Sequence, residues 1–328
     1  MTEHSQTQPP IKAPNPLLSF LGSIWDTVCD IAHTRHGATG GAILLFMAIV
    51  ALLAPIIAPY DPQALTPASL APPSWDNPMG TDNIGRDVFS LVVYGTRTSL
   101  GIGFATALGA LVLGGTVGML AGYFGGLVDT VLMRVAELFQ TLPVIVLVLF
   151  TVAFFGSSFW LLITAMVLAI WPIEARLVYG QYLRLRNMNF IDVARVADMS
   201  AAHIMLRELL PNAIQPVIVQ IALDASVAIL IEAGLGFLGL SDPNVVSWGQ
   251  LLYEAQSYMT VAWWISLFPG AAICLAIAGL NLFADGLNEI VDPRARGRKE
   301  GYSNDAQAAR HIKPATGTGY RQSASGSA

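Results

Sequence analysis

The chain has 328 residues, of which 54% are hydrophobic and only 12% are charged. A soluble domain usually carries about 25% charged residues, so this composition, with a mean hydropathy of +0.57, excludes an ordinary soluble fold and predicts a protein that lies in the lipid bilayer. The net charge is −5, and no part of the sequence forms the basic domain that nucleic-acid binding would need.

Apolar runs follow one another along most of the chain, and a helix needs about 20 mostly apolar residues to cross a bilayer. We predict an all-α membrane protein with six transmembrane helices, at residues 40–58, 100–122, 138–155, 159–173, 213–235 and 263–283. The first run is too long for a signal-peptide core and is predicted to be retained. These helices form one domain, residues 40–296, preceded by a polar segment, residues 1–39.

Residues 297–328 are rich in Gly, Ser, Ala and Thr. A segment of this composition cannot bury enough apolar surface to fold, so it predicts a disordered tail.

Arginines decide the predicted topology. Several lie between residues 174 and 212 and again after residue 293, whereas residues 241–261 contain neither Lys nor Arg. The positive-inside rule places the cationic segments in the cytoplasm. Six spans then put both termini in the cytoplasm, the loops at 60–97 and 241–261 outside, and a loop at 123–137 inside.

Small residues form a stripe on the second predicted span. Gly114, Gly118 and Gly122 recur at four-residue spacing, which places them on one face of a helix. Such a stripe lets another helix approach closely where the hydrophobic effect is absent. A helix crossing within the chain and an interface with another subunit both fit this pattern.

Residues 187–211, NMNFIDVARVADMSAAHIMLRELLP, read as two short helices joined by a turn at residues 198–200. Ser200 fits the N-cap of the second helix, and Pro211 would close the unit before the fifth span. An amphipathic helix lying on lipid is the alternative. The mixture of acidic and basic side chains favours a protein partner, because a lipid-bound helix is usually more cationic.

The same segment resembles the EAA loop of ABC importer permeases, whose pattern is Glu-Ala-Ala, three residues, Gly, nine residues and Ile-x-Leu-Pro. The chain has Asp192-Val193-Ala194 at the start and Leu210-Pro211 at the end, at matching spacing. It departs from the pattern at Asp198, where the family has its turn glycine, and at Glu208, in place of the isoleucine. Asp tolerates the left-handed turn conformation better than most residues, so the loop shape is expected to survive.

Three further stretches, at residues 77–100, 231–252 and 263–294, resemble the C-type permeases of dipeptide, oligopeptide and nickel importers. The resemblance covers about residues 40–296. It implies a type I permease subunit of six helices in a bacterial plasma membrane, paired with a homologous second permease. It also implies two cytoplasmic ATPase subunits, which bind ATP and Mg²⁺, and an external substrate-binding protein. The substrate would be a dipeptide or oligopeptide; nickel or another small solute is the alternative.

In this interpretation the 187–211 segment docks on an ATPase and moves as a body. The residues predicted to make or shape this contact are Phe190, Ile191, Asp192, Val193, Ala194, Asp198, Ile204, Leu209 and Pro211. The sequence has no Gly-x-x-x-x-Gly-Lys-Ser/Thr cradle for phosphates. We therefore expect no cofactor and no catalytic residue on this chain.

Two acidic residues fall in the fifth span. Carboxylates in a membrane are costly and usually face a cavity or a partner. Asp224 is the better candidate for lining a polar translocation path. Glu232 is nearer the outer end, where a structural role is the competing interpretation.

Other classes of function find less support. The string Gly-Leu-Gly-Phe-Leu-Gly at residues 234–239 ends a predicted span, so it is not a dinucleotide site. The histidines show no zinc spacing. A secondary transporter would usually show internal repeats, and none is evident. An intramembrane enzyme is not supported either, because the sequence has no His-Glu-x-x-His, no Gly-x-Ser-x-Gly and no paired aspartates in separate spans. A scaffold without transport would leave the acids in the membrane without a role.

Overall fold

A computed structural model describes residues 34–66 and 68–291. Most of the predicted N-terminal segment and all of the predicted tail, residues 297–328, lie outside the described residues. Within these residues every regular element is helical, apart from one isolated bridge between Thr81 and Asp87. Five helices are long and apolar enough to cross a membrane, or six if a bent pair counts as one span. The predicted helical membrane fold is therefore confirmed.

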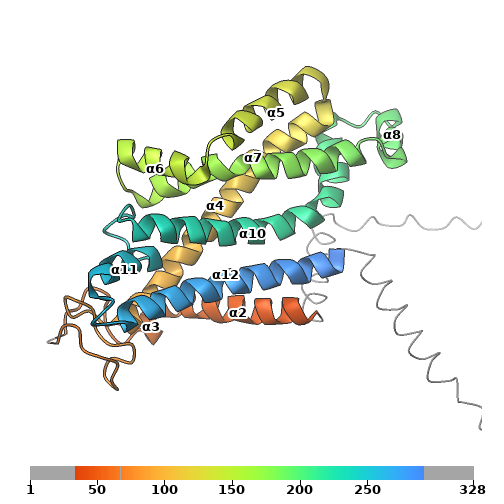
Figure 1. The fold of residues 1–328 in the computed structure, drawn as a ribbon. Helices are drawn as coiled ribbons and strands as arrows, with labels where there is room; N and C mark the ends of the chain where they lie inside the picture. The colour runs from red at the N-terminus through yellow and green to blue at the C-terminus, as the bar shows by residue number, and fades with distance from the viewer. Residues whose placement is uncertain (1–33, 67, 292–328) are drawn as a thin grey trace, which may run out of the picture. The chain divides into compact units, whose positions relative to one another are not determined.

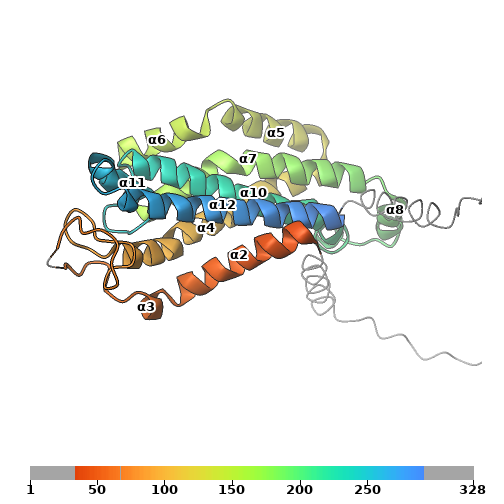
Figure 2. The same ribbon diagram turned by 60° about the horizontal axis from the view of Figure 1, so that its bottom comes forward.

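The long helices lie side by side in both views of the chain (Figures 1 and 2). The helices are α2 (Arg35–Leu52), α3 (Ala54–Ile57), α4 (Val88–Phe124), α5 (Gly126–Gln140), α6 (Val144–Phe155), α7 (Phe159–Leu185), α8 (Asn189–Val196), α9 (Ala201–His203), α10 (Leu210–Phe237), α11 (Trp248–Ala255) and α12 (Trp264–Val291). A π-helical turn, Ile204–Leu209, joins α9 to α10, and a 3-10 turn, Gln256–Tyr258, follows α11.

The third predicted span is wrong as a single helix. Residues 138–155 contain the end of α5 and all of α6, and α5 and α6 are bent by 79° relative to each other. Pro143 is the N-cap of α6, and its missing N–H cannot continue the preceding helix. The predicted loop at 123–137 is also wrong, because it consists of the end of α4 and most of α5, separated by Gly125 with φ +66°.

The second, fourth, fifth and sixth spans extend further than predicted, and α4 begins at Val88, inside the predicted 60–97 loop. Helix α7 continues through Pro172 to Leu185, so Glu174 lies inside it. Helix α10 does not begin after a closed unit at Pro211. Residues 201–237 form one continuous helical stretch, with the π-helical turn placed just before Pro211. A proline disturbs only the turn that precedes it, and tertiary packing holds the helix together on both sides.

The glycine stripe of α4 packs against α7. A Cβ added to Gly114 would lie 2.2 Å from the carbonyl oxygen of Trp171, and one added to Gly118 would lie 2.3 Å from that of Ala175. A Cβ at Gly122 would lie 2.5 Å from the Cβ of Tyr182. These approaches leave no space for a larger side chain, so this stripe serves a crossing within the chain.

The two connections predicted to face outward pack together around two tryptophans. Trp248 of α11 is fully buried and its Nε1 donates to the carbonyl oxygen of Val92, 3.1 Å away. Trp264, at the start of α12, donates from Nε1 to the carbonyl oxygen of Thr81 at 3.1 Å. We call residues 58–87 and 238–263 together the loop end; in Figure 1 it lies opposite α8.

Candidate functional site

The turn inside the 187–211 segment has the predicted left-handed backbone. Asp198 has φ +57°, and its N–H donates to the carbonyl oxygen of Arg195 at 3.0 Å. The Ser200 hydroxyl accepts a hydrogen bond from the N–H of His203 at 3.3 Å, as expected of an N-cap. The segment therefore keeps the helix–turn–helix shape although Asp198 occupies the turn position.

Burial divides the predicted contact residues into two groups. Ile191, Ala194, Ile204 and Leu209 are buried in a cluster of apolar side chains that the chain itself forms with the end of α7 and the start of α10. These side chains seat the segment and are not available to a partner in this conformation. In this structure they hold the segment in place, and their predicted part in the contact stays a prediction.

The exposed side chains are the ones a partner could touch. Phe190 and Val193 are 37% and 68% exposed, and Val196 is 89% exposed. Sequence reasoning missed Val196, although its position three residues after Val193 places the two on neighbouring turns of one face. Asp192 is exposed and pairs with Arg195 at 3.2 Å. Asp198 and Pro211 are also exposed.

Two long helices hold the segment. Helix α10 continues directly from it, and α7 reaches it through Tyr182, whose buried hydroxyl donates to the carbonyl oxygen of Met205 at 2.8 Å. The same carbonyl also accepts from the N–H of Leu210, the bond of a π-helical turn. Pro211 follows at once, and since it has no N–H, the wider turn is the local solution. The segment is thus attached to both α7 and α10.

Arginines near this end bond within the chain. Arg186 Nη1 donates to the carbonyl oxygen of Gly122 at 3.0 Å, where α4 ends. Arg176 lies 3.5 Å from Glu137 of α5. Arg207 is exposed.

Two buried carboxyl groups meet between α7 and α10. Glu174 is fully buried and Asp224 is 3% exposed, and the two groups interact with each other. Asp224 Oδ1 accepts a hydrogen bond from Gln220 Nε2 at 2.8 Å. Asp224 Oδ2 and both oxygens of Glu174 have no hydrogen-bond partner. The sequence reasoning did not pair them, because the predicted end of the fourth span at residue 173 left Glu174 outside the membrane.

Glu232 occupies a different kind of site near the loop end. It is fully buried, and its two oxygens lie 3.4 Å from the Ser99 hydroxyl and 3.5 Å from the Ser241 hydroxyl. Ser99 Oγ in turn accepts from the N–H of Trp248 at 3.2 Å. These contacts support the structural interpretation. Neither Glu232 nor Asp224 reaches the surface of the chain, so a place on a translocation path stays a prediction for both.

A cation and two acids tie the loop end together. Arg86 Nε lies 2.6 Å from Asp82 Oδ2, and Arg86 Nη2 contacts Glu254 of α11. Burial alone would lower the pKa of Arg86, but its hydrogen bonds and the charges of Asp82 and Glu254 raise it overall. The Arg86 guanidinium therefore stays charged and joins the two connections.

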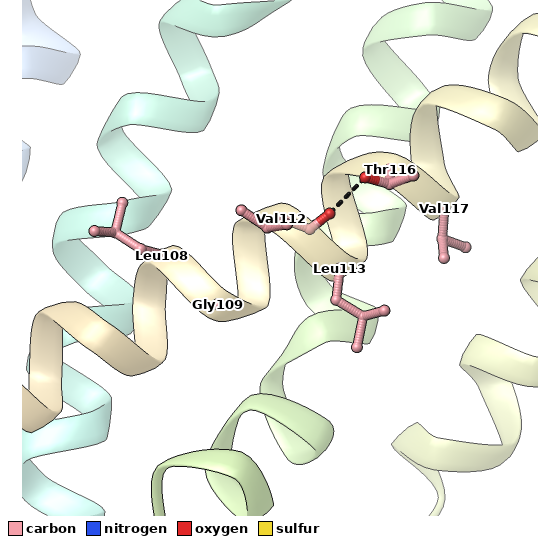
Figure 3. A pocket seen from close by; sticks show the side chains of 6 residues that line it. All are labelled: Leu108, Gly109, Val112, Leu113, Thr116 and Val117. Atoms are coloured by element: carbon pink, nitrogen blue, oxygen red, sulfur yellow. Dashed lines mark hydrogen bonds between the residues drawn. The ribbon is translucent and has the colours of Figure 1, made fainter. Parts of the chain in front are cut away.

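An open apolar groove of about 540 Å³ follows one face of α4 (Figure 3). It is lined by Leu108, Gly109, Val112, Leu113, Thr116 and Val117. The Thr116 hydroxyl donates to the carbonyl oxygen of Val112 at 2.6 Å, as the dashed line shows, so the groove offers little polar chemistry. Among the described residues no three His, Cys, Asp or Glu side chains are grouped to hold a metal ion.

Two family models match the chain. Residues 114–297 match the binding-protein-dependent transport system inner membrane component, and residues 35–73 match the N-terminal TM domain of oligopeptide transport permease C. The first match includes the 187–211 segment, both buried carboxyl groups and Glu232. It extends a few residues beyond the described part.

Curated relatives cover most of the chain. The dipeptide transport system permease protein DppC of Alkalihalophilus pseudofirmus is 36% identical over 81% of this chain and 88% of its own length. The di/tripeptide transport system permease protein DppC of Pseudomonas aeruginosa is 35% identical over 88% and 96%. The probable D,D-dipeptide transport system permease protein DdpC of Escherichia coli is 35% identical over 80% and 88%.

A solved structure shares the fold. A chain of the inward-facing MetNI methionine ABC transporter is similar with a TM-score of 0.50 and 20% identity, over 62% of this chain and 95% of that chain. At this identity the likeness concerns the arrangement of helices.

Proposed function

This chain belongs to the family of binding-protein-dependent transport system inner membrane components, and we propose that it is the permease subunit of an ATP-driven importer of dipeptides or oligopeptides. It is a multi-pass protein of a bacterial inner membrane, similar over most of its length to peptide permeases. In the proposal it forms half of the translocation pathway beside a homologous second permease. Two ATPase subunits bind ATP and Mg²⁺ in the cytoplasm, and an external binding protein delivers the substrate.

The observation that carries the coupling part of the proposal is the construction of the 187–211 segment. Its buried face is joined to α7 and α10 by apolar packing and by the bond from Tyr182 to Met205. Its other face exposes apolar side chains at Phe190, Val193 and Val196. Exposed apolar residues on a firmly seated short helix are typical of a surface that a partner protein covers.

The mechanism follows from this attachment. When the ATPase dimer closes on ATP, the 187–211 segment is displaced and carries the ends of α7 and α10 with it. The helices then favour a different packing, in which the pathway opens to the other side of the membrane. ATP shifts this equilibrium only through the difference in its affinity for the two states, so the contact with the segment must differ between them.

Peptides are the proposed substrate class because the relatives above are named for dipeptides and tripeptides. No feature of the described residues favours nickel or another small solute. Substrate choice is expected to depend largely on the binding protein, which is a separate chain.

The test reconstitutes this chain in lipid vesicles with its second permease and ATPase subunits and measures ATP hydrolysis with and without a binding protein loaded with dipeptide. We expect stimulation that requires the loaded binding protein. A double variant, Val193→Ser with Val196→Ser, should weaken ATPase binding and lower both stimulation and peptide uptake by at least tenfold.

The matched control is Val131→Ser on α5, a valine that is 58% exposed and lies outside the segment. It should leave ATPase binding and uptake unchanged. Full coupling in the double variant would refute the proposed contact, and failure of the chain to form any complex with ATPase subunits would refute the permease function itself. If the complex is intact but no peptide stimulates its ATP hydrolysis, the substrate belongs to another class of compound.

A further inference from the structure

Glu174 and Asp224 are the described acidic residues whose carboxyl oxygens are buried and lack partners. Of their four oxygens, one receives a hydrogen bond, from Gln220, and the other three receive none. The residues come from different helices, α7 and α10, and their carboxyl groups interact. Natural proteins rarely leave buried polar atoms unsatisfied, so these three oxygens call for an explanation.

Among residues 34–66 and 68–291, no cation lies beside the pair. On the side of α4, Gly114 faces Glu174, and a Cβ there would lie 2.8 Å from the Glu174 Cβ; α4 has no titratable side chain between Arg97 and Tyr123. The other titratable groups on the helices packed nearby have partners or positions elsewhere. On α7, Arg176 pairs with Glu137 of α5, Tyr179 bonds to Asp129 of α5, and Tyr182 bonds to Met205. On α10, Glu232 contacts serines near the loop end. On α12, Asp285 is exposed.

Two adjacent carboxylates without a cation cannot both remain ionised in a buried site. A single proton resolves the conflict, because a carboxylic acid can donate to a carboxylate in a short, strong hydrogen bond. We propose that Glu174 and Asp224 together form a proton-binding site that joins α7 to α10. A proton is small enough for this site, where even a Cβ added to Gly114 of α4 would lie only 2.8 Å from the Glu174 Cβ.

The proton-binding site lies on the two helices that hold the 187–211 segment. Glu174 lies eight residues, about two turns, before Tyr182, which bonds to Met205 of the 187–211 segment. Asp224 lies on the helix that continues from that segment. The bound proton therefore joins the same two helices that hold the segment. Its loss would place two negative charges across the α7–α10 contact.

The first experiment is infrared spectroscopy of the purified complex that contains the full chain, recorded over a range of pH. We expect the carbonyl band of a protonated carboxyl group at neutral pH, which disappears on strong alkalinisation. The band should be weaker in Glu174→Gln and in Asp224→Asn than in the unchanged protein, because Glu232, another buried acid, can contribute to it. It should be unchanged in the control Asp285→Asn, which changes an exposed acid. Absence of the band at neutral pH in the unchanged protein, or a band of equal intensity in both amide variants, would overturn the proposal.

Thermal unfolding of the same complex gives a second, independent readout. The shared proton stabilises the folded chain at low pH, and this stabilisation is lost as the pH rises far enough to remove it. The unfolding midpoint of the unchanged protein should therefore fall by several degrees on alkalinisation. The double variant Glu174→Gln with Asp224→Asn keeps a hydrogen bond without a titrating proton. The part of the fall in unfolding midpoint that comes from loss of the shared proton should therefore be absent in this variant. An equal fall in the double variant would overturn the proposal.

Discussion

Both ends of the helices have an apolar core, but they differ in their buried polar contacts. At the loop end, buried polar groups make specific hydrogen bonds and ion pairs, as Arg86 and Trp248 show. At the other end, the 187–211 segment is seated mainly by apolar side chains, with one buried hydrogen bond from Tyr182. Hydrogen bonds depend strongly on geometry, whereas apolar contacts are non-directional. The loop end therefore adds directional polar contacts to its apolar core, whereas the 187–211 segment depends mostly on apolar packing.

Removal of the central tryptophan of the loop end should have the largest effect on stability. Trp248 is fully buried, and Trp248→Ala should destabilise the fold by about 3–5 kcal/mol because a large cavity opens and the bond to Val92 is lost. The measurement is thermal unfolding of the purified chain in detergent. Trp75→Ala is the matched control: Trp75 lies in the same end of the molecule but is fully exposed, so its loss should leave the midpoint unchanged. Equal effects of the two changes would contradict the description of this end.

The ion pairs of the loop end should come next. Arg86→Met leaves the buried Asp82 and the partly buried Glu254 without their cation, at a cost of about 2 kcal/mol. Chemical denaturation would measure it. The same change at Arg134, whose pair with Glu137 is exposed, should cost less than about 0.5 kcal/mol. A loss at Arg134 as large as that at Arg86 would show that burial does not decide the strength of these pairs.

At the segment end, Tyr182→Phe should affect transport more than it affects the free energy of unfolding. The change removes one buried hydrogen bond, worth about 1 kcal/mol, while the Met205 carbonyl keeps its bond from Leu210. We expect a small loss of stability but a several-fold fall in peptide transported per ATP hydrolysed, because α7 loses its polar link to the segment. Tyr179→Phe removes a bond to Asp129 of α5 and should leave this ratio unchanged. An unchanged ratio in Tyr182→Phe would show that α10 alone transmits the movement.

The smallest predicted effect concerns pH at the loop end. The N–H of Asn244 lowers the pKa of Asp242 below its ordinary value of 3.8. Burial opposes this, and the N–H of Phe159 and the side chain of Asn244 lower the pKa further. The folded chain therefore favours the ionised form of Asp242. The stability that this ionised group contributes to the fold is complete above about pH 4 and is lost as the pH falls through the lowered pKa of Asp242. Asp242→Asn should reduce the loss of stability on acidification, measured by thermal unfolding between pH 6 and about pH 2. If the unchanged protein and Asp242→Asn lose the same stability on acidification, Asp242 does not contribute to this pH dependence.

Much of this protein could be read from the sequence because the signals are local. Long apolar runs predict helices wherever the chain lies in lipid, and the structure has them in α4, α7, α10 and α12. The turn at Asp198 and the cap at Ser200 depend on a few neighbouring residues, and both were predicted. The glycine spacing predicted a close helix contact, although not which helix would make it.

Tertiary structure decided the rest, because contacts between distant segments are not encoded at any one position. Two prolines show this: Pro143 ends a helix, while Pro172 lies within α7, since packing against α4 stabilises the helix on both sides of it. The burial of Ile191 and Ala194 and the exposure of Val196 follow from where α7 and α10 end. The pairing of Glu174 with Asp224 likewise arises only when two helices separated by many residues pack together, because proximity of charges is a property of the fold.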